Sequence, residues 1–202
     1  FIDGETSGNY SKTLLNEFSK TIAKINLHLL KLPLENKIVW KKDHQFKLLD
    51  TIYIDFKGFK ILNENKKILS ELKNINKSKL RKSAIHGDYH PVNLIVRDKK
   101  VVSVIDWGDS HEDYLCQEIS SLILDLILEN SSNFNKIKQV TKEYQKILPF
   151  NQEERIAMYY FIKVRFLGGI NWHIKMSKLH PDKKKKLEKE AVETKHTKEV
   201  LR

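Results

Sequence analysis

Several residue types are scarce in this chain, and each scarcity narrows the classes of protein that fit it. A single cysteine, Cys116, excludes a disulfide framework and argues against a cysteine-based zinc site. Seven glycines and four prolines in 202 residues favour a mostly helical chain. The best candidate for a membrane span, residues 122–128, is far shorter than the roughly 18 apolar residues required and contains Asp125. With no visible signal peptide, we expect a cytoplasmic protein without a membrane partner.

Arginine is also scarce, although the chain is basic. The formal net charge is +11, and only five of the 37 basic residues are arginine. A basic surplus can indicate a nucleic-acid partner, but such segments usually combine arginine with aromatic residues. The lysine-rich C-terminal segment, residues 175–202, has no aromatic residue and a single arginine. We therefore attribute the charge to composition and expect no nucleic-acid partner.

The spacing of apolar residues predicts several helices and one hairpin. Ser11 is a plausible N-cap for the first helix, residues 12–32, because apolar side chains recur every three or four positions after it. Two β-branched runs, residues 94–96 and 101–105, flank a polar turn at 98–100 and predict a β-hairpin. Further helices are expected at residues 59–72, 114–129, 134–148 and 153–176, with a last one from Pro181.

Polar residues with a characteristic spacing flank this hairpin. His86-Gly87-Asp88 is followed by an asparagine, Asn93, five residues after Asp88, and the hairpin ends in Asp106-Trp107-Gly108. The kinase pattern H-R-D-x-x-x-x-N, hairpin, D-F-G has the same order and spacing. Phosphoryl transfer needs one carboxylate facing the attacking hydroxyl, and oxygen ligands for Mg²⁺ beside the phosphates. The spacing therefore predicts a phosphotransferase site.

At these residues the chain resembles a known family. Residues 86–93 (HGDYHPVN) and 105–110 (IDWGDS) are similar to the motifs of the aminoglycoside phosphotransferase family, the choline-kinase-like small-molecule kinases. The resemblance implies an α+β, mostly helical fold: the C-terminal lobe of a protein-kinase-like fold with a catalytic-loop β-hairpin. It also implies ATP or GTP as phosphate donor and Mg²⁺ as cofactor.

The resemblance assigns roles residue by residue. Asp88 would be the catalytic base or a carboxylate that orients the acceptor hydroxyl. Asn93 and Asp106 would be the magnesium ligands. His86 and His90 would support the catalytic loop, and we expect Trp107 to pack under the metal site rather than to bind substrate.

The resemblance also suggests how the chain is divided. Phe1 to Glu5 looks like the end of a hinge between two lobes, so residues 1–10 are predicted to be a hinge remnant and residues 11–202 the C-terminal lobe. The glycine-rich turn, the strand lysine and the helix glutamate of a nucleotide-binding lobe are not found in this sequence. We therefore expect that lobe to be missing from this chain, and the isolated chain to be inactive.

An acidic segment follows the hairpin. Residues 106–118 contain five carboxylates and no lysine or arginine, in contrast to the rest of the chain. If Asp109, Glu112 and Asp113 line the acceptor site, they would attract a cationic hydroxyl compound such as an aminoglycoside, which would make the protein an antibiotic-resistance enzyme. Alternatively, Glu112 and Asp113 begin a helix and interact with its dipole.

Other functions remain open at this point. A metabolic kinase of the same superfamily would act on choline, homoserine or a sugar. A non-catalytic fragment would only bind a ligand. Such a remnant would not be expected to retain Asp88, Asn93 and Asp106 together, as this chain does.

Overall fold

The computed structural model describes residues 2–6, 11–32, 67–68, 70–129, 134–179 and 182, and its first helix is the one that the sequence predicts. Helix α1 (Lys12–Lys31) starts after Ser11, whose Oγ accepts a hydrogen bond from Leu14 N at 3.4 Å. This bond satisfies one of the amides that a helix start leaves unpaired. The apolar stripe of α1 is buried, with Leu15, Phe18 and Ile22 inaccessible to solvent.

The predicted hairpin is confirmed. Strand β3 (Leu94–Arg97) pairs with β4 (Lys100–Val104), and β1 (Glu5–Thr6) adds to the other edge of β3, all antiparallel. The connecting residues, Asp98 and Lys99, have φ of 51° and 60°. Two successive left-handed residues are typical of a two-residue type I′ turn, whose twist matches that of the strands.

A second small sheet was not predicted. Strand β2 (Lys82–Ile85) pairs antiparallel with β5 (His111–Tyr114). The expectation of a helix from Tyr114 is therefore wrong at its start, because residues 111–114 find backbone partners in β2 and helix α4 (Glu118–Glu129) begins later. The alternative in which Glu112 and Asp113 begin a helix is wrong for the same reason.

The remaining helices largely follow the predicted pattern. Helix α5 (Phe134–Gln145) ends slightly earlier than expected, and α6 (Gln152–Leu179) extends beyond both predicted ends. Residues 70–73 are helical, but most of the helix expected at 59–72 and the one expected from Pro181 lie outside the described residues. None of the described helices is long and apolar enough to cross a bilayer.

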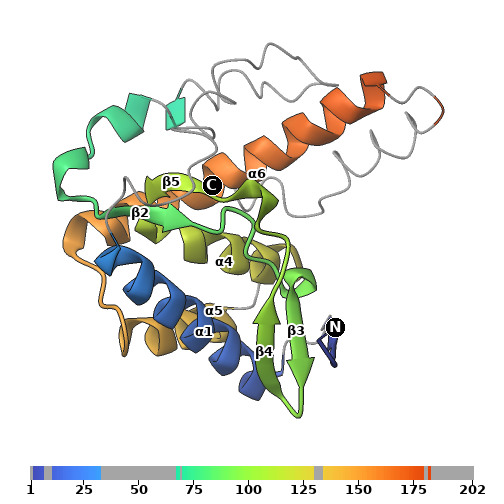
Figure 1. Ribbon diagram of the computed structural model, residues 1–202. Coiled ribbons are helices and arrows are strands. Elements are labelled where there is room, and N and C mark those ends of the chain that lie inside the picture. The colour runs from blue at the N-terminus through green and yellow to red at the C-terminus, as the bar shows by residue number, and fades with distance from the viewer. Residues whose placement is uncertain are drawn as a thin grey trace.

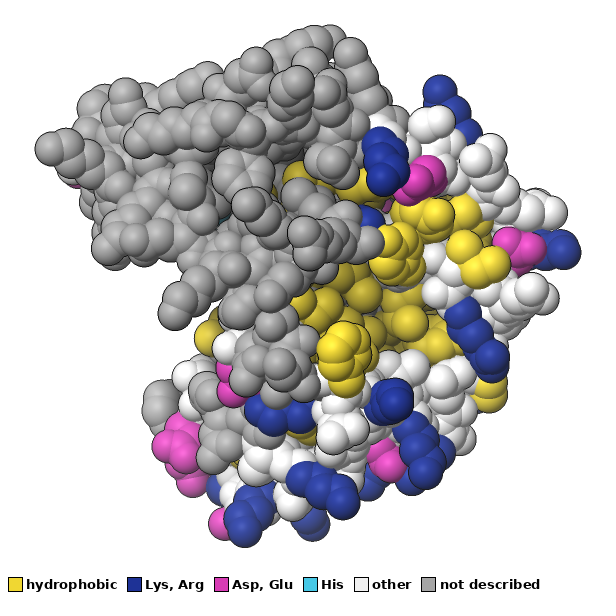
Figure 2. Space-filling model, turned by 180° about the vertical axis from the view of Figure 1, so that it is seen from behind, with side chains coloured by type: hydrophobic (Ala, Val, Ile, Leu, Met, Phe, Trp, Pro, Cys, Tyr) yellow, Lys and Arg dark blue, Asp and Glu magenta, His cyan; other side chains and the backbone are white. Residues whose placement is uncertain are grey.

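The helices form one core with the hairpin beside it. Figure 1 shows α1, α4 and α5 packed together, the β3–β4 hairpin at their side, and α6 running past α4. A buried polar contact joins α1 to α5, because Asn26 Nδ2 donates to the Tyr144 hydroxyl at 3.0 Å. On the face in Figure 2, lysine and arginine side chains are dispersed around an apolar centre. The coloured, described part of this face has no continuous basic stripe.

A buried ion pair attaches α6 to the start of β2. Asn151 Oδ1 accepts from Glu154 N at 2.8 Å, and Glu154 Oε2 accepts from Asn151 N at 3.0 Å, which is a reciprocal capping box. The Glu154 carboxylate is fully buried and also accepts from Arg81 Nε at 2.7 Å and Arg81 Nη2 at 2.6 Å. This contact fixes α6 relative to the strand that leads to residues 86–93.

Replacing Glu154 should therefore destabilise the fold strongly. In Glu154→Ala, the partly exposed Arg81 loses its partner carboxylate and the helix loses its cap, so the free energy of unfolding should fall by about 2–4 kcal/mol in urea titrations. The adjacent Glu153→Ala is the matched control, because Glu153 forms only a surface pair with Lys79 at 3.8 Å. Its effect should stay below about 1 kcal/mol. Equal effects of the two variants would contradict the structural role assigned to Glu154.

A second buried pair lies in β5. His111 Nε2 lies 3.4 Å from Asp113 Oδ2, and both side chains are almost fully buried. Burial lowers the pKa of His111, but the Asp113 carboxylate and the carbonyl of Asp109 outweigh it, so the net pKa is raised above its ordinary value of 6.5. Because the folded state holds the proton more tightly, the protonated pair stabilises the fold.

The stability contributed by His111 should consequently depend on pH. It should be fully present below about pH 6.5 and should be lost as the pH rises through the higher folded-state pKa. We expect the difference in free energy of unfolding between wild type and His111→Gln to shrink from acidic to alkaline pH. The exposed His28 provides the control. In His28→Gln, the pH dependence of the free energy of unfolding should remain that of the wild type. A difference that grows as the pH rises would contradict the conclusion that the protonated form of His111 stabilises the fold.

Candidate active site

Residues 86–93, here named the Asp88 loop, connect β2 to β3. The loop closes with a 3₁₀ turn, Pro91–Asn93, in which Asn93 N donates to the carbonyl of His90 at 2.9 Å. Its start requires glycine: Gly87 has φ of 82°, and a Cβ there would collide with the Asp109 carbonyl and lie 3.0 Å from ring atoms of His111. The Asp88 loop is therefore packed closely against the acidic segment that follows the hairpin.

Asp88 is held by donors from three sides. Its Oδ1 accepts from Arg165 Nη2 at 2.5 Å and lies 3.1 Å from His90 Nε2, and its Oδ2 accepts from Asn93 Nδ2 at 3.1 Å. The side chain nevertheless remains about one third exposed. The carboxylate is thus fixed in orientation while one side of it stays accessible.

Charges of both signs surround Asp88, and its two cationic neighbours also contact each other, because Arg165 Nη2 lies 2.8 Å from His90 Nε2. Burial raises the pKa of Asp88, but the hydrogen bond and charge of His90, together with Arg165, lower it well below its usual range. His90 in turn lies between Asp88 and Asp125, with its Nδ1 at 2.6 Å from Asp125 Oδ2. Burial lowers the pKa of His90, whereas the two carboxylates raise it to about 9. Asp88 is consequently ionised and His90 protonated at neutral pH.

The first residue of α4 holds the backbone of the Asp88 loop. The buried carboxylate of Glu118 accepts hydrogen bonds from the main-chain amides of His86 and Gly87. Burial raises the pKa of Glu118, although its interactions with His86 and with these amides oppose that effect. The His86 ring joins the loop to the end of the hairpin, because its Nε2 lies 2.9 Å from the Ile105 carbonyl oxygen.

Asn93 and Asp106 come together at the base of the hairpin. Ile105 N donates to the Asn93 carbonyl at 2.9 Å, which places Asp106 next to the residue that pairs with Asn93. Asn93 Nδ2 also donates to the main-chain carbonyl of Asp88 at 2.9 Å, which orients Oδ1 away from Asp88. Asp106 is exposed and left-handed, with φ of 61°. The backbone pairing thus places Asn93 and Asp106 near each other beside the Asp88 loop.

The oxygen ligands that Mg²⁺ prefers are present in this pair. The described part of the chain contains no group of three or more His, Cys, Asp or Glu side chains that could hold a metal ion. Trp107 lies beside the pair: its Nε1 donates to the Val104 carbonyl at 2.9 Å, and its ring centroid is 4.6 Å from that of His86. Trp107 is nevertheless 40% exposed, and its role under a metal site stays a prediction.

The three further acidic residues differ in their access to solvent. Asp109 is exposed and Glu112 is half-buried, whereas the Asp113 side chain is inaccessible. Asp113 Oδ1 accepts from the amide of Tyr114 at 2.7 Å, and Oδ2 faces His111. Only Asp109 and Glu112 therefore remain available for contact with a ligand.

Two residues at the Asp88 loop were missed by sequence reasoning. Asp125 comes from α4 and Arg165 from α6, far from the motif in the sequence. A weak signal existed for both, since each is a charged residue within an apolar stretch, and arginine is scarce. Nothing in the local pattern indicates that Arg165 meets Asp88 or that Asp125 meets His90.

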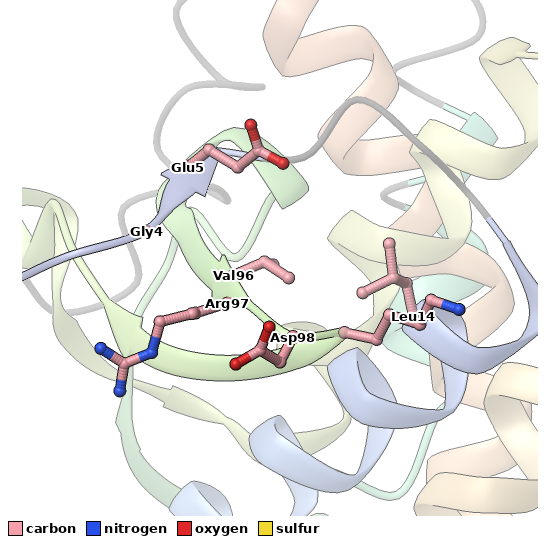
Figure 3. Close-up of a pocket in the computed structure, with 7 residues that line it drawn as sticks. Gly4, Glu5, Leu14, Val96, Arg97 and Asp98 are labelled. Carbon is pink, nitrogen blue, oxygen red and sulfur yellow. The ribbon is translucent and has the colours of Figure 1, made fainter.

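A cavity of about 480 Å³ lies elsewhere on the hairpin. Figure 3 shows it between β1, the hairpin turn and the start of α1, with Arg97 extending away from Leu14. Its lining residues, Gly4, Glu5, Leu14, Val96, Arg97, Asp98 and Lys99, include none from the Asp88 loop. The cavity is therefore distinct from the candidate active site.

Solved structures of small-molecule kinases share this fold. Amicoumacin kinase hAmiN, in complex with AMP-PNP, Ca²⁺ and Ami, aligns with a TM-score of 0.68 at 14% identity, over 95% of this chain and 62% of that one. The choline kinase LicA of Streptococcus pneumoniae aligns with a TM-score of 0.63 at 15% identity, over 96% and 66%. The AMP-bound spectinomycin phosphotransferase gives 0.68 at 16% identity, over 100% and 70%. The expected α+β, mostly helical kinase-like fold is confirmed.

Sequence comparison agrees with the fold. A hydroxylysine kinase of Danio rerio is 24% identical over 90 residues, which cover 42% of this chain and 25% of that protein. The match thus spans about a quarter of this relative. The profile of the phosphotransferase enzyme family (APH) matches residues 14–144, which include the Asp88 loop, the hairpin and α4. The chain therefore belongs to the phosphotransferase enzyme family, as its loop motifs indicate.

Proposed function

We propose that this protein transfers the γ-phosphate of ATP or GTP to a hydroxyl group of a small molecule, with Mg²⁺ as cofactor. The observation that carries the proposal is the arrangement around Asp88: a partly exposed carboxylate bonded to Asn93, whose backbone pairs with the residue before Asp106. Family membership supports the reaction class, and the nucleotides in related structures support the donor.

In this proposal Asp88 orients the acceptor hydroxyl. Two cationic neighbours, Arg165 and His90, hold its pKa well below the usual range. A carboxylate stabilised in this way is a weak proton acceptor, which favours the orienting role over that of a strong general base. Positioning of the attacking oxygen is a large part of catalysis in phosphoryl transfer.

Asn93 and Asp106 would hold the metal ion. Mg²⁺ is commonly bound by one or two carboxylates together with substrate phosphates, so an amide oxygen and one carboxylate are a suitable protein contribution. When bound, the ion neutralises charge that develops on the phosphates. His86 supports this side of the site through its contacts with Ile105 and Trp107.

We further propose that residues 1–10 form a hinge and residues 11–202 the catalytic and acceptor-binding lobe. The pairing of β1 with β3 supports this division, because it joins the N-terminal segment directly to the catalytic hairpin. A cytoplasmic location would give the enzyme access to its nucleotide.

For the acceptor we favour a cationic hydroxyl compound. Asp109 and Glu112 lie on the segment that follows Asp106, and both are accessible. An aminoglycoside, as a cationic compound, fits the negative charge of these two side chains. Such an acceptor would make the protein an antibiotic-resistance enzyme. The second candidate is metabolic: the relatives include kinases named for choline and hydroxylysine, which also carry positive charge.

The proposed reaction depends on Asp88. In the complete protein, Asp88→Asn should lower kcat by about 10²–10⁴-fold, because the amide cannot orient the hydroxyl in the same way. The KM for nucleotide should change little, since Asp88 faces the acceptor. Asp98→Asn is the matched control: Asp98 is exposed in the hairpin turn, where asparagine tolerates the left-handed backbone. Steady-state kinetics would refute the assignment if Asp88→Asn kept wild-type turnover.

The acceptor proposal predicts a dependence on salt. With a cationic acceptor, kcat/KM should fall as ionic strength rises, because salt screens the attraction. The fall should be weaker in a double variant, Asp109→Asn with Glu112→Gln. A control double variant with the same charge change, Asp98→Asn with Glu129→Gln, should behave like wild type. A preference for neutral or anionic acceptors across a substrate panel would exclude the aminoglycoside proposal without affecting the kinase assignment.

A further inference from the structure

Arg165 contacts three residues of the Asp88 loop: it forms hydrogen bonds with Gly87 and Asp88, and its Nη2 also lies 2.8 Å from His90 Nε2. Its Nη1 donates to the Gly87 carbonyl at 2.6 Å, and its Nη2 donates to Asp88 Oδ1 at 2.5 Å. The Arg165 side chain is only 13% exposed, so the contact lies largely out of water. A planar guanidinium with donors on both nitrogens is suited to bridging a carbonyl and a carboxylate in one geometry.

The donors around Asp88 are unevenly distributed between its two oxygens. Oδ1 faces Arg165 Nη2 and His90 Nε2, and each carboxylate oxygen offers about two acceptor positions. Oδ2 has a single side-chain donor among the described residues, Asn93 Nδ2. A position that can accept a further hydrogen bond therefore remains on Oδ2 and not on Oδ1.

The other anchors of the loop do not duplicate this contact. Glu118 holds the main-chain amides of His86 and Gly87, and Asp125 reaches Asp88 only through His90. Both of these residues belong to α4, whereas Arg165 belongs to α6. Without Arg165, the Asp88 side chain would lose its shortest contact and its link to α6.

Resting on the proposed function, we propose that Arg165 is a positioning residue of the phosphotransfer reaction. It fixes the Asp88 carboxylate so that Oδ2 receives the hydrogen of the acceptor hydroxyl. Arg165 also keeps a fixed positive charge next to the attacking oxygen, which favours an acceptor whose own cationic group lies away from the reacting hydroxyl. The cationic part of such an acceptor would then lie toward Asp109 and Glu112.

The test compares variants of Arg165 in the complete protein. Arg165→Ala should lower kcat by roughly 10- to 100-fold, since small errors in positioning are costly, with little change in the KM for nucleotide. Arg165→Lys should recover part of kcat, because one donor can still reach Asp88. Guanidinium chloride at a non-denaturing concentration should restore activity to Arg165→Ala, whereas sodium chloride at equal ionic strength should not. Arg155→Ala, at an exposed position on the same helix, should match wild type.

The outcomes separate this inference from the proposed function. If Asp88→Asn is inactive but Arg165→Ala has wild-type kcat, the inference is wrong and the function stands. A loss in Arg165→Ala that neither lysine nor guanidinium restores, and that follows the loss of folded protein in thermal unfolding, would show a purely structural role and overturn the inference. If Asp88→Asn itself remains active, the proposed function is wrong, and so is the inference that rests on it.

Discussion

Holding one ionised carboxylate at the edge of the core is the constraint that shapes the rest of the molecule. Removing the charge of Asp88 partly from water costs free energy, and only donors with good geometry offset that cost. Arg165 and His90 supply two cations, and Asp125 supplies the anion that keeps His90 protonated. The result is a cluster of charges of both signs that reaches from α6 through the Asp88 loop to α4. The two helices must therefore keep fixed positions relative to the loop.

The supporting contacts can be understood from this requirement. Glu154 and Arg81 fasten the start of α6 to the strand that enters the loop, and Glu118 fastens the start of α4 to the loop amides. Each uses a buried carboxylate at the first turn of a helix, where unpaired amides and the helix dipole favour negative charge. The loop is thus attached to helix ends, which are more rigid than other loops.

The sequence predicts the features that depend on neighbouring residues, and it misses the contacts that join distant parts of the chain. Ser11, the apolar stripe of α1 and the Asp98-Lys99 turn act within a few residues, so the pattern is sufficient to find them. The pairing of β2 with β5 joins Lys82 to Tyr114 across the whole hairpin, and no local period contains that information. Arg165 meets Asp88 across 77 residues, so that contact required the folded chain. The motif predicts Asp88, Asn93 and Asp106 as site residues because their spacing is itself local.

The glycine at position 87 has a consequence for how acceptor preference can change within such a scaffold. With no room for a Cβ between the Asp88 loop and the Asp109 carbonyl, the backbones of the two segments are interlocked. An insertion or deletion in residues 106–113 would be transmitted directly to the Asp88 carboxylate. Exchanges of the accessible side chains at 109 and 112 leave both backbones where they are. Divergence toward new acceptors is therefore expected through point substitutions in this segment, with its length unchanged.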